Sequence, residues 1–88
     1  MTGHNEVSAG ERSRWNRRFL AGEKIGGAKF RHNAQVRYVD HSGNSVEGWI
    51  VALEFRDSGP AYTVERSDGE PDAEVVESSL MLLHDPHE

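Results

Sequence analysis

The chain has 88 residues, no cysteine and a formal net charge of −5. This length allows one domain with a small core, and the lack of cysteine excludes both a disulfide framework and a thiolate metal site. No long apolar run marks a signal peptide or a membrane span, so we expect a cytoplasmic protein that has no membrane partner.

Charge is distributed unevenly along the chain. Residues 11–31 carry seven basic side chains and two acidic ones, whereas residues 32–88 carry three basic and twelve acidic ones. This asymmetry is typical of a basic arm attached to an acidic body. We therefore expect a basic N-terminal arm at 1–33, a folded body at 34–84 and a tail at 85–88.

The arm is predicted to contain a helix over about residues 9–21. Ser8 and Glu11 have the spacing of a capping box, which marks a helix N-terminus. One face of this helix is apolar and consists of Trp15, Phe19 and Leu20. A helix this short is marginal alone, so it needs a surface to dock on. A Gly-rich linker is expected at 22–30.

After the linker the hydrophobic period changes to two, which is typical of strands. Strands are predicted at 34–40, 47–55, 61–66, 73–77 and 81–84, with a 3₁₀ turn at 78–80. Five short, closely spaced strands indicate a small antiparallel barrel. The ending of strand, Asp-Gly turn, strand, Ser-Ser-Leu turn and strand resembles SH3-like and Tudor-like barrels. We predict a mainly β protein: a five-stranded SH3-like antiparallel barrel with a short N-terminal helix.

The second predicted strand is apolar on both faces, although a half-exposed antiparallel strand should alternate apolar and polar residues. Strict alternation places Ile50 and Ala52 on one face. It places on the other face Trp49, Val51, Leu53 and Phe55. Either the helix of the arm or a second copy of the barrel must cover this outer face. We expect that these four residues mediate self-association into a dimer or tetramer.

A closer resemblance covers residues 36–65. This stretch resembles the core of the plasmid-borne type II dihydrofolate reductases, which are small SH3-like barrels that assemble as tetramers around a central pore. The shared pieces are Val36-Arg37, Ser42-Gly43, Gly48, Ile50-Val51, Gly59 and the run at 61–65. The chain also resembles small plasmid and integron cassette proteins of unknown role.

The catalytic motif of the reductase family is absent from this chain. The family binds folate and nicotinamide cofactor with a Val-Gln-Ile-Tyr-Pro strand, whereas the aligned residues 72–76 read Asp-Ala-Glu-Val-Val. The family's lysine falls on Tyr38. Carboxylates in this strand would repel anionic ligands. We therefore predict a shared fold without a cofactor, and a dihydrofolate reductase-like enzyme is the alternative.

The Tudor-like resemblance implies an aromatic cage that holds methylated lysine or arginine by cation–π attraction. The candidate ligand-binding residues are Tyr38, Trp49, Phe55 and Tyr62. The acidic loops would favour a cationic protein or peptide ligand. The same rings also fit a barrel core or an interface, and Arg66 stands where such modules often place an aromatic residue.

The basic arm offers a third interpretation, a nucleic-acid-binding module. Its candidate contact residues are Arg12, Arg14, Trp15, Arg17 and Arg18. Arginines could hold phosphate while the aromatic ring stacks on bases. The acidic body would repel the nucleic-acid backbone, so docking of the arm on an acidic body, its own or a neighbour's, is the simpler interpretation.

No pattern predicts a catalytic or metal site. No serine sits in a Gly-x-Ser-x-Gly elbow, and the acids at 65–77 read as a solvated rim rather than as a carboxylate pair in unlike environments. His84 and His87 are close in sequence, but Pro86 between them breaks a helical display, so we expect a solvated tail. The prediction is a non-catalytic binding or assembly module.

Overall fold

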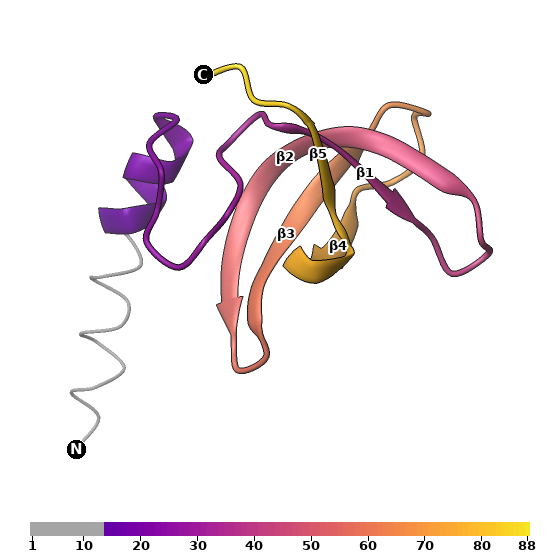
Figure 1. Ribbon diagram of the computed structural model, residues 1–88, viewed down its shortest axis with the longest axis horizontal. Helices are drawn as coiled ribbons and strands as arrows, with labels where there is room; N and C mark the ends of the chain where they lie inside the picture. Colours follow the sequence, from indigo (N-terminus) through magenta and orange to yellow (C-terminus); the bar gives the residue numbers. More distant parts are fainter. Residues whose placement is uncertain (1–13) are drawn as a thin grey trace.

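The computed structural model describes residues 14–88 (Figure 1). Its main element is one antiparallel sheet with the strand order β4-β3-β2-β1-β5. The elements are β1 (Gln35–Val39), β2 (Ser45–Arg56), β3 (Gly59–Arg66), β4 (Ala73–Val76), the 3₁₀ turn η1 (Glu77–Ser79) and β5 (Met81–His84). The mainly β fold, the five strands and the 3₁₀ turn are therefore confirmed, with small differences at the element ends.

The sheet has two edges, β4 and β5, and no ladder joins them. The sheet is thus not closed by hydrogen bonds, and the barrel stays a prediction. β2 is long and strongly bent, and it pairs with β1 through its first part and with β3 along most of its length (Figure 1). Residues at the end of β1 and residues of β4 line a common pocket.

A β-bulge in β2 changes which of its residues face the core. The ladder with β3 shifts register between Ile50 and Ala52, and an extra residue reverses the alternation beyond it. Ile50 and Leu53 are therefore both buried, whereas Trp49 and Phe55 are 39% and 42% exposed. Strict alternation is wrong here, and the bulge divides the predicted self-association set of Trp49, Val51, Leu53 and Phe55.

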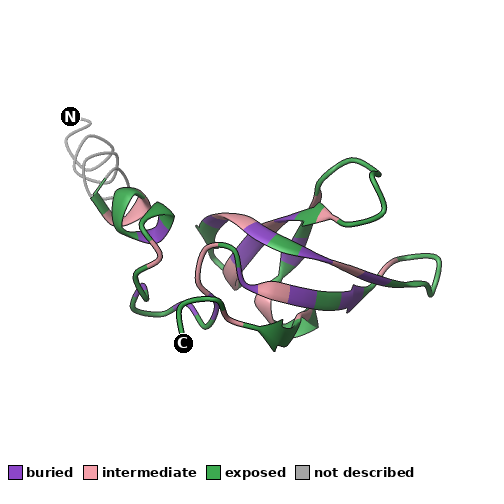
Figure 2. Ribbon diagram, turned by 90° about the horizontal axis from the view of Figure 1, so that it is seen from above, coloured by how far each residue is buried: buried purple, intermediate pink, exposed green. Residues whose placement is uncertain are grey.

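The core lies on one face of the sheet. Buried and exposed residues alternate along β1 (Figure 2), as expected for a strand with one covered face. The largest fully buried side chains are Phe19, Val36, Ile50, Tyr62 and Val64. The segment before β1 adds Ile25, Ala28 and Phe30 to the same cluster. The predicted Gly-rich linker is irregular, but it forms part of the core.

A helix at residues 14–20 lies beside the end of β2 (Figure 1). The Trp15 ring packs edge-on against Phe55, with ring centroids 5.3 Å apart, and Phe19 packs similarly against His32 at 5.5 Å. The predicted apolar face therefore docks through two of its three residues, whereas Leu20 is 50% exposed.

The residues after β5 are tied to the segment before β1. The Arg31 side chain lies 3.8 Å from the Asp85 carboxylate and donates a 3.2 Å hydrogen bond to the His87 carbonyl oxygen. The His87 ring lies 3.0 Å from the His32 carbonyl oxygen, and it also covers Gly22, where a Cβ would collide with it. The tail is largely exposed, as expected for a solvated tail, and these contacts with residues distant in sequence hold it in place.

Candidate functional site

The four aromatic residues of the predicted cage do not converge. Tyr62 and Tyr38 are only 1% and 6% exposed and belong to the core cluster. Trp49 is exposed on the face of the sheet opposite the core, where it pairs with Gln35 of β1. Phe55 lies at the far end of β2 against the helix. The structure therefore places two of the rings in the core and separates the other two from them.

Tyr62 belongs instead to a hydrogen-bond junction with Glu77 at its centre. The Tyr62 hydroxyl donates to Glu77 Oε2 at 2.6 Å and accepts from the Phe30 N–H at 3.2 Å. The Lys29 N–H donates to the same Glu77 oxygen at 2.7 Å. Burial, and then the bond to the carboxylate, raise the pKa of Tyr62, because both favour the neutral phenol.

Other acids of the predicted solvated rim are paired with arginines. Asp68 accepts a 2.6 Å hydrogen bond from Arg66, and this bond lowers the pKa of the Asp68 carboxyl. Glu74 on β4 accepts a 2.5 Å bond from Arg56. Solvent screens both pairs, so their contribution to stability is small. At least these two acids of the predicted rim therefore have an arginine partner.

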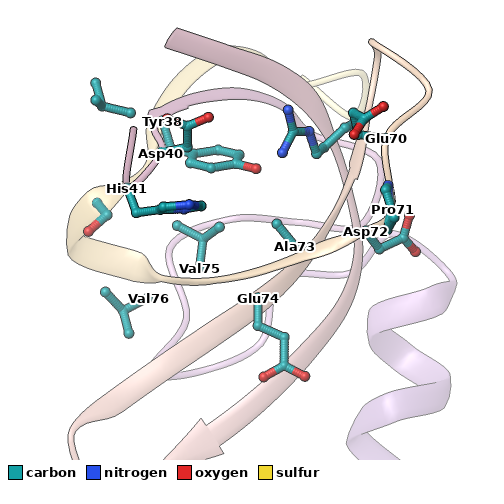
Figure 3. Close-up of a pocket in the computed structure, with 13 residues that line it drawn as sticks. Tyr38, Asp40, His41, Glu70, Pro71, Asp72, Ala73, Glu74, Val75 and Val76 are labelled. Carbon is teal, nitrogen blue, oxygen red and sulfur yellow. The ribbon is translucent and has the colours of Figure 1, made fainter. Parts of the chain in front are cut away.

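A pocket of about 540 Å³ opens between β1 and β4 (Figure 3). Residues 38–41 form one wall and residues 70–76 form the other, and Arg66 and Ser79 complete the lining. Its volume falls within the range of roughly 300–1,000 Å³ that is typical of ligand pockets. The acidic side chains of the lining are Asp40, Glu70, Asp72 and Glu74. We call this the β1–β4 pocket.

Tyr38 contributes a buried polar atom to the β1–β4 pocket. Figure 3 shows its ring extending from β1 toward the middle of the pocket, and the residue is part of the lining. The hydroxyl oxygen is buried and has no hydrogen-bond partner among the described residues. Leaving such a group unpaired costs about 1–3 kcal/mol. A ligand atom that bonded this hydroxyl would recover that cost.

Residues of the basic arm are only partly within the described range. The predicted helix start near Ala9, the capping box of Ser8 and Glu11, and Arg12 lie outside residues 14–88. The arginines within that range, Arg14, Arg17 and Arg18, are exposed on the helix, and Arg18 forms a 3.0 Å ion pair with Glu23.

Trp15, the aromatic residue that the arm was predicted to offer for base stacking, is half-buried. Its ring packs on Phe55, so the helix does not present it freely beside the arginines. The arrangement is a helix that uses its aromatic residue to dock on the sheet. Its exposed arginines can still attract an acidic partner.

Apolar side chains remain exposed on β5 and on the outer face of the sheet. All four residues of β5 are exposed, with Met81 at 59%. Met81 stands opposite Arg37 of β1, and Trp49 stands one row further along the same face, opposite Gln35. Alternation in β2 predicts that Trp49 is exposed on the outer face. The exposure of β5 could not be predicted in this way, because its apolar sequence is also typical of a buried strand.

Within residues 14–88, no group of three or more histidine and acidic side chains is placed to hold a metal ion, and no helix has the length and hydrophobicity needed to cross a bilayer. Comparison of the chain with protein-family models, with curated proteins and with solved structures found no match in any of the three.

Proposed function

We propose that this protein is a non-catalytic assembly module, an SH3-like barrel that self-associates through β5. The strand order β4-β3-β2-β1-β5, the bent β2 and the 3₁₀ turn between the last two strands support the barrel. In a barrel of this kind, η1 connects the two edge strands, β4 and β5. The oligomer then provides the additional buried surface that a chain of this length needs.

The exposed edge strand β5 carries the proposal. β5 pairs with β1 alone among the described residues, so its other edge has free backbone groups. Soluble proteins protect such edges with charges, prolines or bulges, because a free apolar edge pairs readily with another chain. Here the edge residues Met81, Leu82 and Leu83 are all exposed and uncharged. The ladder with β1 shifts register between Leu82 and His84, so the edge is irregular at Leu83 but carries no charge in its first three residues.

A second copy of the chain is the partner that this edge fits best. Two β5 strands related by a two-fold axis pair antiparallel, and each copy then supplies the same edge to the other. The opposite edge, β4, is less suited to self-pairing because it carries Glu74 and is followed by Glu77. Like charges opposite each other destabilise a strand pair.

The proposed interface differs from the one that strict alternation in β2 predicts. Leu53 is buried in the core, and Phe55 already contacts Trp15 of the helix. Only Trp49 of the predicted set is both exposed and on the face that β5 shares. β1 separates Trp49 from β5, so Trp49 shares the outer face with Met81 but is not part of the β5 edge.

The positions of Glu77 and Glu74 support a structural role for these two carboxylates. Glu77 bonds Tyr62 and the Lys29 backbone, and Glu74 bonds Arg56. General acid–base catalysis needs a carboxyl group that a pocket shifts toward neutral pH. These carboxylates instead hold parts of the fold together.

Molecular mass measured by sedimentation velocity tests the proposal. We expect the full chain to form a dimer whose fraction rises with protein concentration. The double variant Met81→Lys and Leu83→Lys should be monomeric, because charge on both residues disfavours edge pairing. Leu20→Lys is the matched control, since it charges an exposed apolar residue of the helix. A monomeric wild-type chain, or a double variant that dimerises as the wild type does, would overturn the proposal.

A further inference from the structure

We propose that the β1–β4 pocket binds the cationic side chain of an extended basic peptide, and that the Tyr38 hydroxyl accepts a hydrogen bond from its ammonium or guanidinium group. The pocket lining includes no residue of β5. The inference therefore goes beyond self-association, and the two sites can be tested separately.

The charge of the pocket favours a cation. Asp40, Glu70 and Asp72 line it, and no arginine or lysine within residues 14–88 forms an ion pair with any of them. The one guanidinium of the lining, Arg66, is already bonded to Asp68 by two hydrogen bonds. The remaining negative charge concentrates cations in a concave site.

The Tyr38 hydroxyl is an independent sign of a ligand. Buried polar groups almost always have a partner, so each exception requires an explanation. The hydroxyl oxygen lacks one among the described residues, and it belongs to a residue that lines the pocket. An anionic ligand could accept from this hydroxyl, but the carboxylates would repel it. A cationic N–H donor satisfies both the hydroxyl oxygen and the carboxylates.

The free edge of β4 indicates that the cation belongs to an extended chain. All four residues of β4 line the pocket, although successive side chains of a strand point to opposite faces. The pocket therefore runs along the edge of β4, where backbone groups are unpaired because β3 is the only strand beside β4 within residues 14–88. An extended peptide can add to such an edge by main-chain hydrogen bonds while one of its side chains enters a pocket.

The helix of the same molecule does not occupy this position. It contacts Phe55 at one end of β2, whereas the pocket includes residues of the β1–β2 turn at the opposite end (Figure 1). The described helix therefore leaves the pocket open to a peptide from another chain.

Nuclear magnetic resonance titration of the full-length, ¹⁵N-labelled protein tests the inference. The probes are three capped hexapeptides that alternate threonine with arginine, with lysine or with glutamate. We expect the arginine or the lysine peptide to shift the amide signals of residues 38–41 and 70–76, and the glutamate peptide to leave them unchanged. The stronger of the two basic peptides identifies the preferred cation.

Two pocket variants and one control locate the contact. Tyr38→Phe and Asp72→Asn should each weaken the basic peptide about tenfold, which corresponds to one lost charge-assisted hydrogen bond. Asp57→Asn removes an exposed carboxylate in the β2–β3 turn, outside the pocket lining, and should change the affinity little. Circular dichroism and urea unfolding confirm that each variant is folded.

Some results would overturn the inference. These are the absence of shifts in both pocket walls with either basic peptide, equal binding of the glutamate peptide, or wild-type affinity in both pocket variants. The outcome is independent of self-association: the pocket variants should sediment as the wild type does, and the Met81→Lys and Leu83→Lys double variant should still bind the peptide.

Discussion

The Tyr62 hydroxyl donates a 2.6 Å hydrogen bond to Glu77 Oε2, and this contact joins β3 to the 3₁₀ turn that precedes β5. The Phe30 N–H bonds the same hydroxyl, and the Lys29 N–H bonds the same carboxylate oxygen. One tyrosine and one glutamate therefore hold together three segments that lie far apart in the sequence. The segment before β1 is fixed to the sheet through this junction.

The two buried tyrosines should respond differently to loss of the hydroxyl. Tyr62→Phe leaves the buried Phe30 N–H without its partner and should lower the free energy of unfolding by about 1–3 kcal/mol. Tyr38→Phe is the matched control, because the Tyr38 hydroxyl has no partner among residues 14–88, and it should leave stability unchanged or raise it. Urea unfolding measures both values. Equal losses in the two variants would contradict the role of the junction.

Stability should fall at alkaline pH because of Tyr62. Its pKa is raised in the folded state, so as pH rises above the ordinary tyrosine value of about 10 the unfolded chain loses this proton first. Ionisation of the unfolded chain then favours unfolding, so the stabilisation that the neutral Tyr62 hydroxyl contributes is lost as pH approaches the pKa of the folded state. The difference in unfolding free energy between the wild type and Tyr62→Phe should therefore narrow from pH 8 to pH 11. A difference that stays constant or widens would contradict this assignment.

Gly48 permits the close approach of β2 and β3. A Cβ at this position would collide with the Glu65 carbonyl oxygen and the Val64 side chain. Gly48→Ala should therefore destabilise the protein by about 1–3 kcal/mol, as overpacked sites do. Gly26→Ala is the control, since no atom lies within 4 Å of its added Cβ. Thermal unfolding should separate the two variants, and similar melting temperatures would argue against the close approach.

The contact between Trp15 and Phe55 should couple the helix to the sheet. Edge-to-face pairs contribute about 0.5–1.5 kcal/mol beyond the area that they bury. A double-mutant cycle with Trp15→Ala and Phe55→Ala should give a coupling energy of this size, measured by urea unfolding. Leu20→Ala, on the exposed side of the helix, should change stability by less than about 0.5 kcal/mol. Strictly additive losses would show that the two rings do not interact in solution.

The five strands could be predicted because local signals define each of them. Alternation of apolar and polar residues marks the strands, and residues suited to turns separate them: Gly43, Gly59 and Gly69 all adopt positive φ between consecutive strands or at a strand start. The docking face of the helix followed from the spacing of Trp15 and Phe19. All of these features depend on residues that are close in sequence.

The features that sequence reasoning missed depend on distant partners or on one inserted residue. The bulge after Ile50 reverses the alternation of β2, yet β-branched and apolar residues continue through it without a break. Glu77 looks like one more acid of a solvated rim, because its partner Lys29 is 48 residues away. The sequence pattern points to the ring of Tyr38 as a ligand contact, whereas in the structure its buried hydroxyl lacks a partner among residues 14–88.

Isotope-filtered nuclear Overhauser spectra can detect pairing of β5 with β5 of a second copy. The sample is an equal mixture of ¹³C,¹⁵N-labelled and unlabelled full-length chains at a concentration where the dimer dominates. We expect intermolecular signals between the Met81–His84 strands of the two copies, in an antiparallel register. A dimer whose intermolecular signals arise elsewhere, or a sample that shows none because the chain is monomeric, would contradict this pairing.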